Sequence, residues 1–198
     1  MNTSEKTTPK AKASNSKVKT SSKISQSEKV KNHDEDSDLL EFFVDELKDI
    51  YWAENHLLKA LPEMKEAATT AELEDAIAQH IVETENQVAR LDQIFEILGE
   101  KAEAKKCEAM AGLVKEAQQL LKDTEDDSIV RDVAIIFASQ KVEHYEIATY
   151  GSLKALAQIM GESEIEALLE ETLAEEKNCD VTLSTLATGF INEQALKE

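Results

Sequence analysis

Two glutamates near the middle of one predicted helix are the residues best suited to do chemistry. Glu143 and Glu146 are three residues apart, which places them one turn apart on the same side of a helix. That side faces the core because apolar residues recur around it at helical spacing; they are Val133, Ile136, Phe137, Ile147 and Tyr150. Carboxylates turned toward a core are costly unless a cation compensates them, and that cation is either a metal ion or a Lys or Arg side chain.

The helix that carries these glutamates is one of four long helices that the periodicity predicts. The long helices cover residues 38–68, 70–98, 129–160 and 164–188, and a shorter helix covers 106–122. Thr69 and Ser163 each stand three residues before a glutamate, the spacing of a capping box at a helix start. The predicted ends are followed by Gly99, Gly161 and Gly189. The predicted fold class is therefore all-α.

The other three long helices carry acids in comparable positions. Glu54 interrupts the apolar stripe of the first helix, and Glu83 lies at the edge of the stripe of the second. Glu176 and Asp180 lie four residues apart in the stripe of the last one. Helices joined by a short turn pack antiparallel, so residues equally far from the turn lie at one level. These acids then meet Glu143 and Glu146 near the middle of a four-helix bundle.

Six carboxylates at one level repel one another strongly unless cations lie among them. The nearest basic residues are expected to face outward; they are Arg90, Arg131, Lys141 and Lys177. Two divalent ions would neutralise four of the six charges, and hard oxygen ligands suit iron or manganese better than a structural zinc. The sequence therefore favours a two-metal site in the bundle, and a buried network of ion pairs is the alternative.

Five segments keep their order and spacing between residues 38 and 190: LLEFFVDELKDIYWAENHLLKALPEM, HIVETENQVARLDQIFEILG, KKCEAMAGLVKEAQQLLKD, AIIFASQKVEHYEIATYGSLKALA and LLEETLAEEKNCDVTLSTLA. They resemble the bacterial YciF/YciE stress proteins, a family of unknown function among the ferritin-like, rubrerythrin-related bundles. The resemblance implies a ferritin-like four-helix bundle with an extra helix in the long crossover. It also implies a homodimer with a two-metal centre, whose ligands by position are Glu54, Glu83, Glu143, Glu146, Glu176 and Asp180.

The chain departs from the usual ferritin-like pattern at the histidine positions. Ferritin-like oxidases carry Glu-x-x-His on two helices, whereas here Asn86 follows Glu83 and Cys179 follows Glu176 at that spacing. His80 stands one turn before Glu83, where it either coordinates metal or is a core-edge histidine bonded to an acid. The second interpretation is the commoner one. A buried free cysteine usually packs as a small hydrophobe, so Cys179 is expected outside the site.

The ends of the chain and its composition set the remaining expectations. Residues 1–33 hold eight lysines against two glutamates, a charge of +6, so the rest carries −25 of the total of −19. We expect residues 1–37 to be a disordered tail, 38–190 the bundle and 191–198 a frayed end. The tail either solubilises the protein or contacts nucleic acid weakly and nonspecifically through residues 1–33. Two cysteines, no secretory leader and no membrane-length apolar run favour a cytoplasmic protein that does not enter a membrane.

These observations support two functional hypotheses. The first is a stress-response protein that binds two iron or manganese ions per chain and reacts with dioxygen or peroxide. The second is a non-enzymatic helical stress protein that acts by binding partners. The sequence has no Gly-rich phosphate loop, Ser–His–Asp arrangement or paired CxxC, so hydrolases, kinases and zinc ribbons are set aside.

Overall fold

The structure is a computed structural model that describes residues 38–198, so the predicted tail lies outside the described residues. Four long helices form this part of the chain: α1 (Asp38–Ala67), α2 (Ala71–Leu98), α4 (Ile129–Met160) and α5 (Ser163–Leu186). The shorter α3 (Glu108–Asp123) lies in the connection between α2 and α4. A π-helical segment, η1 (Ala187–Ile191), and the short α6 (Asn192–Ala195) follow α5. The described residues contain no strand, as the all-α prediction requires.

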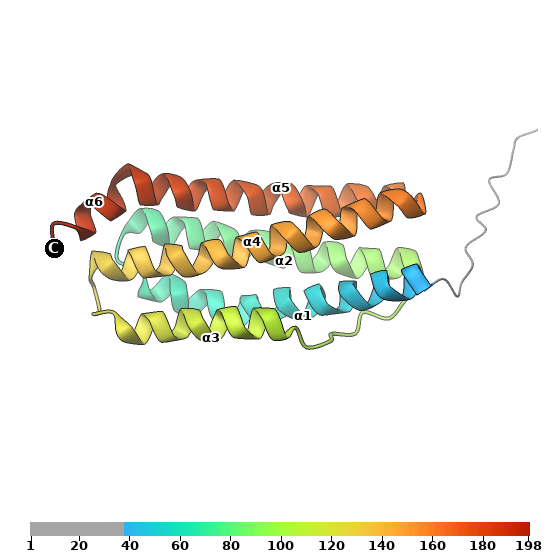
Figure 1. The fold of residues 1–198 in the computed structure, drawn as a ribbon, viewed down its shortest axis with the longest axis horizontal. Helices are drawn as coiled ribbons and strands as arrows, with labels where there is room; N and C mark the ends of the chain where they lie inside the picture. Colours follow the sequence, from blue (N-terminus) through green and yellow to red (C-terminus); the bar gives the residue numbers. More distant parts are fainter. Residues whose placement is uncertain (1–37) are drawn as a thin grey trace, which may run out of the picture. The chain divides into compact units, whose positions relative to one another are not determined.

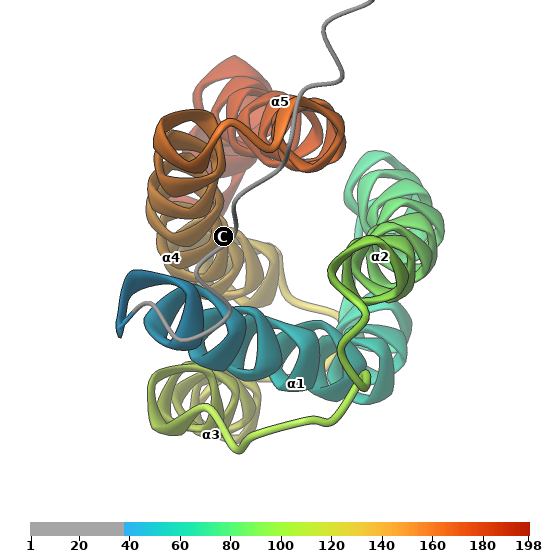
Figure 2. The same ribbon diagram turned by 90° about the vertical axis from the view of Figure 1, so that its right-hand side faces the viewer.

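The long helices form two hairpins that pack against each other. α1 pairs with α2, and α4 pairs with α5 (Figure 1). Seen end-on, the four helices surround a common interior, and α3 lies outside it against α1 and α4 (Figure 2). The four-helix bundle with an extra helix in the long crossover is thereby confirmed. None of the helices among the described residues has the length and apolar character needed to cross a membrane.

The predicted helix ends at two glycines are correct. Gly99 and Gly161 adopt left-handed backbone conformations, with φ of 72° and 78°, and their N–H groups bond back to carbonyls of the last turn. Glycine has no Cβ and adopts this conformation without strain. These two residues therefore close α2 and α4 at the positions that the sequence indicates.

The two predicted capping boxes are wrong. The residue that precedes α2 is Thr70 rather than Thr69, and the residue that precedes α5 is Glu162 rather than Ser163. At α2 the reason is Asp132 on α4, whose side chain is completely buried. Its Oδ1 accepts from Thr69 N at 2.7 Å, and its Oδ2 accepts from Thr70 N at 2.9 Å and from Thr70 Oγ1 at 2.6 Å. A distant carboxylate thus satisfies donors that a local cap would otherwise serve.

The C-terminal residues differ from the expected frayed end. The predicted helix end at Gly189 is wrong, because Gly189 lies inside η1 and the helical backbone continues from there into α6. Ile191 is completely buried, and the Glu198 carboxylate accepts from Ile129 N at 2.9 Å and from Val130 N at 3.3 Å. Burial of one apolar side chain and capping of α4 thus fix this segment, features that the composition of the last residues does not indicate.

The core lies between the four long helices and follows the predicted apolar stripes. Its largest fully buried side chains include Phe43, Leu47, Phe95, Ile135 and Tyr150. Phe137 is an exception, because it was expected on the inner face of α4 and is 57% exposed. Its ring lies 4.4 Å from Lys141 Nζ on the outer surface. One residue rotates a helical side chain by about 100°, so Ile136 faces inward and Phe137 outward.

Candidate metal centre

Five ionisable side chains meet inside the bundle at mid-height. Glu54 comes from α1, His80 from α2, Glu143 and Glu146 from α4, and Glu176 from α5. We call these five residues the central cluster. None is more than 4% exposed. Each long helix therefore contributes to the cluster, as the antiparallel arrangement of two hairpins predicts.

The donor atoms of the central cluster are close enough to share a ligand. One atom each from His80, Glu143, Glu146 and Glu176 lies within 4.8 Å of all the others. Glu54 adjoins this group and repels the charged forms of Glu146 and Glu143. Spacings of this size suit a metal ion bound between the side chains, since metal–oxygen bonds are about 2 Å long.

Most of the side-chain oxygens and nitrogens of the central cluster have no hydrogen-bond partner. Among the described residues, the buried side-chain atoms without a partner are Glu54 Oε2, both ring nitrogens of His80, Gln87 Oε1, Glu143 Oε2, both carboxylate oxygens of Glu146 and Glu176 Oε2. All of them except Gln87 Oε1 belong to the central cluster. Buried polar groups in native proteins are nearly always satisfied. Unsatisfied oxygens and nitrogens that converge at one point are the donor set that a metal ion requires.

Neighbouring side chains hold one oxygen of two of these carboxylates. Tyr150 Oη donates to Glu54 Oε1. Gln87 Nε2 donates to Glu176 Oε1 and also to Glu175 Oε2, the latter at 3.2 Å. The second oxygens of Glu54 and Glu176 have no partner. This arrangement orients each carboxylate and presents its remaining oxygen to the interior.

Two residues correct the expectation that all nearby basic residues face outward, because Arg131 is buried against the end of α3, where it donates to Leu121 O at 2.8 Å, and Arg90 is buried beside the central cluster. Arg90 matters more for the site. Arg90 is only 8% exposed, because its long side chain reaches from α2 across to α5. Its NH1 donates to Glu175 Oε2 at 2.7 Å and to Thr172 Oγ1 at 3.0 Å, and NH2 donates to Glu171 Oε1 at 3.0 Å. These donors are therefore directed to residues beside the central cluster, and none bonds a carboxylate within it.

The electrostatic environment keeps the metal-free cluster largely uncharged. Burial, followed by repulsion from other carboxylates, raises the pKa of Glu54, Glu143 and Glu146 well above the ordinary value. Burial also raises the pKa of Glu176 to about 7 and lowers the pKa of His80 to about 4. The His80 imidazole is thus neutral at pH 7, the form that binds metals. The carboxyls release their protons when a cation enters.

Two of the predicted ligands lie at the rim rather than in the central cluster. Glu83 accepts from Gln79 Nε2 at 3.0 Å, and its side chain is 18% exposed. Asp180 accepts from Gln140 Nε2 at 3.2 Å and lies 3.3 Å from the exposed His144 Nε2. Both carboxylates have polar partners where they stand. The structure therefore brings together four of the six predicted acids, and it adds His80.

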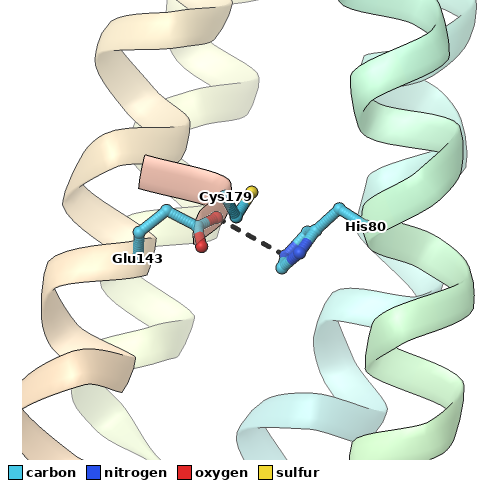
Figure 3. Close-up of side chains that lie close together, drawn as sticks. All are labelled: His80, Glu143 and Cys179. Atoms are coloured by element: carbon cyan, nitrogen blue, oxygen red, sulfur yellow. Dashed lines mark ion pairs between the residues drawn. The ribbon is translucent and has the colours of Figure 1, made fainter. Parts of the chain in front are cut away.

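His80 lacks the bond to an acid that the commoner interpretation requires. Its Nε2 lies 3.5 Å from Glu143 Oε1, and its Nδ1 lies 4.0 Å from Glu83 Oε2. Neither ring nitrogen makes a hydrogen bond. The imidazole enters the bundle from α2 and points at Glu143 on α4 (Figure 3). The chain thus supplies an imidazole one turn before Glu83 instead of one turn after it.

Cys179 is the residue that sequence reasoning missed. Its Sγ, a ring nitrogen of His80 and a carboxylate oxygen of Glu143 lie within 4.8 Å of one another. Cys179 was expected to be a small buried hydrophobe, yet it adjoins His80 and Glu143 (Figure 3). The spacing of three residues after Glu176, where ferritin-like proteins have histidine, indicated this position, but the usual packing of a buried cysteine as a small hydrophobe was given more weight.

Two small cavities adjoin Glu143 from opposite sides. One, of about 20 Å³, lies between α1, α3 and α4 and has apolar walls that include Leu57, Val114 and Val142. The other, of about 10 Å³, is bordered by His80 and Cys179. Volumes of this size hold about one water-sized molecule. These two cavities therefore have room for ions or very small molecules beside the cluster.

Comparison with known proteins shows what the chain is similar to. Residues 38–196 match the family described as a domain of unknown function, DUF892. Protein YciF of Escherichia coli K12 is 43% identical over 154 residues, which are 77% of this chain and 92% of that relative. The match therefore covers nearly all the described residues.

Solved structures of relatives have the same arrangement of helices. The crystal structure of the E. coli stress protein YciF matches with a TM-score of 0.74 at 42% identity, over 78% of this chain and 97% of that one. YcfI of Rhodopseudomonas palustris, described provisionally as a structural protein, matches with a TM-score of 0.73 at 40% identity over the same shares.

Proposed function

This chain belongs to the DUF892 family of YciF-like stress proteins, and we propose that it binds two iron or manganese ions in the central cluster. The observation that carries the proposal is the set of converging, unpartnered donors from four helices. Evolution rarely leaves one buried polar atom unsatisfied without a reason. Here both oxygens of Glu146 and both ring nitrogens of His80 are in that state.

The charge of the central cluster supports two ions rather than one. Its four carboxylates carry a charge of −4 when they are ionised, and two divalent ions supply the opposite charge. One divalent ion would balance only two of the four carboxylates, and the other two would have to stay protonated. Carboxylate oxygens with a single imidazole favour iron or manganese over copper.

The surrounding residues prepare the cluster for this role. Tyr150 and Gln87 each hold one oxygen of Glu54 and Glu176 and so fix the direction of the other. Arg90 binds Glu175 beside the cluster and keeps that additional carboxylate from competing for the ions. Burial excludes water and strengthens every remaining charge interaction. When bound, such ions would supply one-electron redox chemistry toward dioxygen or peroxide.

A second candidate function is a structural role without bound metal. Two observations favour it: Arg90 is buried beside the cluster, and the relative YcfI is described provisionally as a structural protein. In this case the cluster carboxyls stay protonated, and the protein acts through partners. Glu143 and Glu176 can share a proton in this state, but both oxygens of Glu146 and both ring nitrogens of His80 remain without a partner, which weighs against this role.

Metal content after loading tests the proposal. The full chain is incubated anaerobically with Fe(II), and separately with Mn(II), desalted and analysed for metal. We expect about two ions per chain in the wild type and none in Glu54→Gln/Glu146→Gln, which removes two charges but keeps the side-chain shapes. Glu85→Gln alters an exposed glutamate on α2 and should retain both ions.

Either of two results would overturn the proposal. One is a wild type that retains neither iron nor manganese. The other is a double variant that retains as much metal as the wild type, which would place the ions on the acidic surface. Oxygen consumption by the loaded protein then separates a reactive centre from one that only binds metal.

A further inference from the structure

The central cluster has two chemically different ends. At one end, nitrogen, oxygen and sulfur donors converge from three helices: His80 on α2, Glu143 on α4 and Cys179 on α5 (Figure 3). At the other end, Glu54, Glu146 and Glu176 offer only carboxylate oxygens, and one donor atom each of His80 and Glu143 also lies within 4.8 Å of Glu146 and Glu176. Glu143 faces His80 with Oε1, and its Oε2 has no hydrogen-bond partner. It is therefore placed to serve both ends.

The first end is not explained by ordinary core packing. His80 is 4% exposed, and neither of its ring nitrogens makes a hydrogen bond. A neutral imidazole always carries one donor and one acceptor, so a structural core histidine bonds at least one of them. The Cys179 thiol lies against the Glu143 carboxylate. An imidazole without a hydrogen bond therefore points at a thiol that is bonded to a carboxylate. A metal ion between them would satisfy the imidazole and replace the bond between thiol and carboxylate.

Cys107, the other cysteine, has the contacts expected of a structural thiol. Cys107 is 1% exposed and precedes α3. Its Sγ accepts from Met110 N at 3.3 Å and lies 3.0 Å from Tyr145 Oη, which donates to Asp49 at 2.9 Å. Cys107 thus caps a helix and has its polar contacts satisfied. Cys179 caps no helix, and it lies beside His80 and Glu143, two side chains of kinds that bind metals.

We propose that one of the two metal positions of the central cluster, the one bordered by His80, Glu143 and Cys179, prefers a thiophilic divalent ion, zinc or cobalt, while the position at the oxygen end takes iron or manganese. Thiolate and imidazole favour zinc-like ions, whereas carboxylates alone favour harder ones. Three protein ligands leave a fourth position open for water. The pairing with iron or manganese rests on the proposed function above, but the zinc position itself does not.

Binding at this position involves no change of oxidation state. A metal–sulfur bond forms as the S–H bond of Cys179 breaks, a metal–oxygen bond forms as the O–H bond of the Glu143 carboxyl breaks, and both protons leave to solvent. His80 binds through a lone pair and loses no proton, since it is already neutral. The chain would then hold two unlike ions side by side, one of which is redox-inert when it is zinc.

Cobalt(II) is the probe, because cobalt bound to a thiolate gives a charge-transfer band in the near ultraviolet. The full-length, metal-free protein is titrated anaerobically with Co(II). We expect the band in the wild type and in Cys107→Ala, and its loss in Cys179→Ala and Cys179→Ser. The cobalt dissociation constant should rise at least about tenfold in both Cys179 variants. Serine retains the shape and polarity of the side chain, so a folded Cys179→Ser separates lost ligation from lost structure.

Three results would overturn the inference: no band in the wild type, a band that survives in Cys179→Ser, or a band that disappears in Cys107→Ala. Glu54→Gln/Glu146→Gln distinguishes this inference from the proposed function. The double variant should lose iron and keep the cobalt band. If the wild type retains iron but shows no cobalt band, only this inference fails; if it shows the band and retains no iron or manganese, only the proposed function fails.

Discussion

Asp132 and Glu146 are carboxylates on the same helix, and both are completely buried. Their surroundings are nevertheless opposite. Asp132 accepts three hydrogen bonds from Thr69 and Thr70, whereas neither oxygen of Glu146 has a partner. Burial of an acid is therefore not a functional signal by itself. The signal is burial without partners.

The positions of the two residues along the bundle explain the difference. Asp132 lies beside the turn between α1 and α2, where backbone N–H groups at the start of α2 have no helical acceptor. Glu146 lies at mid-helix, where backbone N–H groups are already used within the helices. Only side chains or an external ion can satisfy a carboxylate there. Backbone N–H groups can thus satisfy a structural acid at the end of a bundle. An acid at the middle must instead be paired with a side chain or bind a ligand.

The largest expected effect is on the structural carboxylate. Asp132→Ala leaves the half-buried amides of Thr69 and Thr70 without this acceptor and should lower the free energy of unfolding by about 3 kcal/mol. The measurement is urea unfolding followed by circular dichroism. Asp75→Ala, at an exposed position of α2, is the control and should change stability by less than about 0.5 kcal/mol. A loss as small as the control's would remove the distinction between the two acids.

The next effect is a pH dependence that comes from the central cluster. In metal-free protein, the raised pKa of Glu176, about 7, and of Glu146 means that folding takes up protons above pH 6.5. Stability should then fall as pH rises from 6.5 to 8, by roughly 2 kcal/mol for one carboxyl that stays protonated throughout. His80, whose pKa is lowered to about 4, is neutral in both states above pH 6.5 and does not oppose the trend.

Urea unfolding at the two pH values, in the presence of a chelator, measures this dependence. The same experiment with saturating Mn(II) should abolish the decline, because the ions compensate the ionised carboxylates. Stability that stays constant or rises between pH 6.5 and 8 in the chelated protein would show that the cluster is satisfied by groups other than metal.

The smallest expected effect has the opposite sign to that of Asp132. Glu146→Gln replaces a buried ionisable carboxyl by a neutral amide of the same shape, so metal-free protein at pH 8 should gain about 1 kcal/mol. Unfolding in urea measures the gain, and added Mn(II) should stabilise the wild type but not the variant. A loss of stability comparable with that of Asp132→Ala would mean that Glu146 is structural as well.

The bundle could be predicted from sequence because its determinants are local and periodic. Apolar stripes marked the helices, and Gly99 and Gly161 marked two ends where only glycine adopts the backbone without strain. The capping box before α2 failed because Asp132, far away in sequence, binds the threonines of the turn. Local spacing cannot reveal a competitor that only the tertiary fold supplies.

The site was predicted in part, for reasons of angle and side-chain length. Glu54, Glu143, Glu146 and Glu176 lie within the apolar stripes, and periodicity placed them correctly in the interior. Residues at the edge of a stripe are ambiguous, since one step of about 100° moves a side chain from core to rim. Asp180 and Cys179 are adjacent, and the structure places the cysteine rather than the aspartate beside His80. Arg90 was missed because a long side chain can reach inward from an edge position.

The contact of Asp132 with the turn between α1 and α2 also limits how the length of the chain can vary. Glu54 stands 15 residues before Thr69, and Glu146 stands 14 residues after Asp132. The contact thus joins two helical segments of nearly equal length, each of which ends at the central cluster. One inserted or deleted residue in either segment would shift its glutamate by about 1.5 Å and turn it by about 100°. Changes of length should therefore be excluded from these two segments and accumulate elsewhere, as in the connection over residues 99–107.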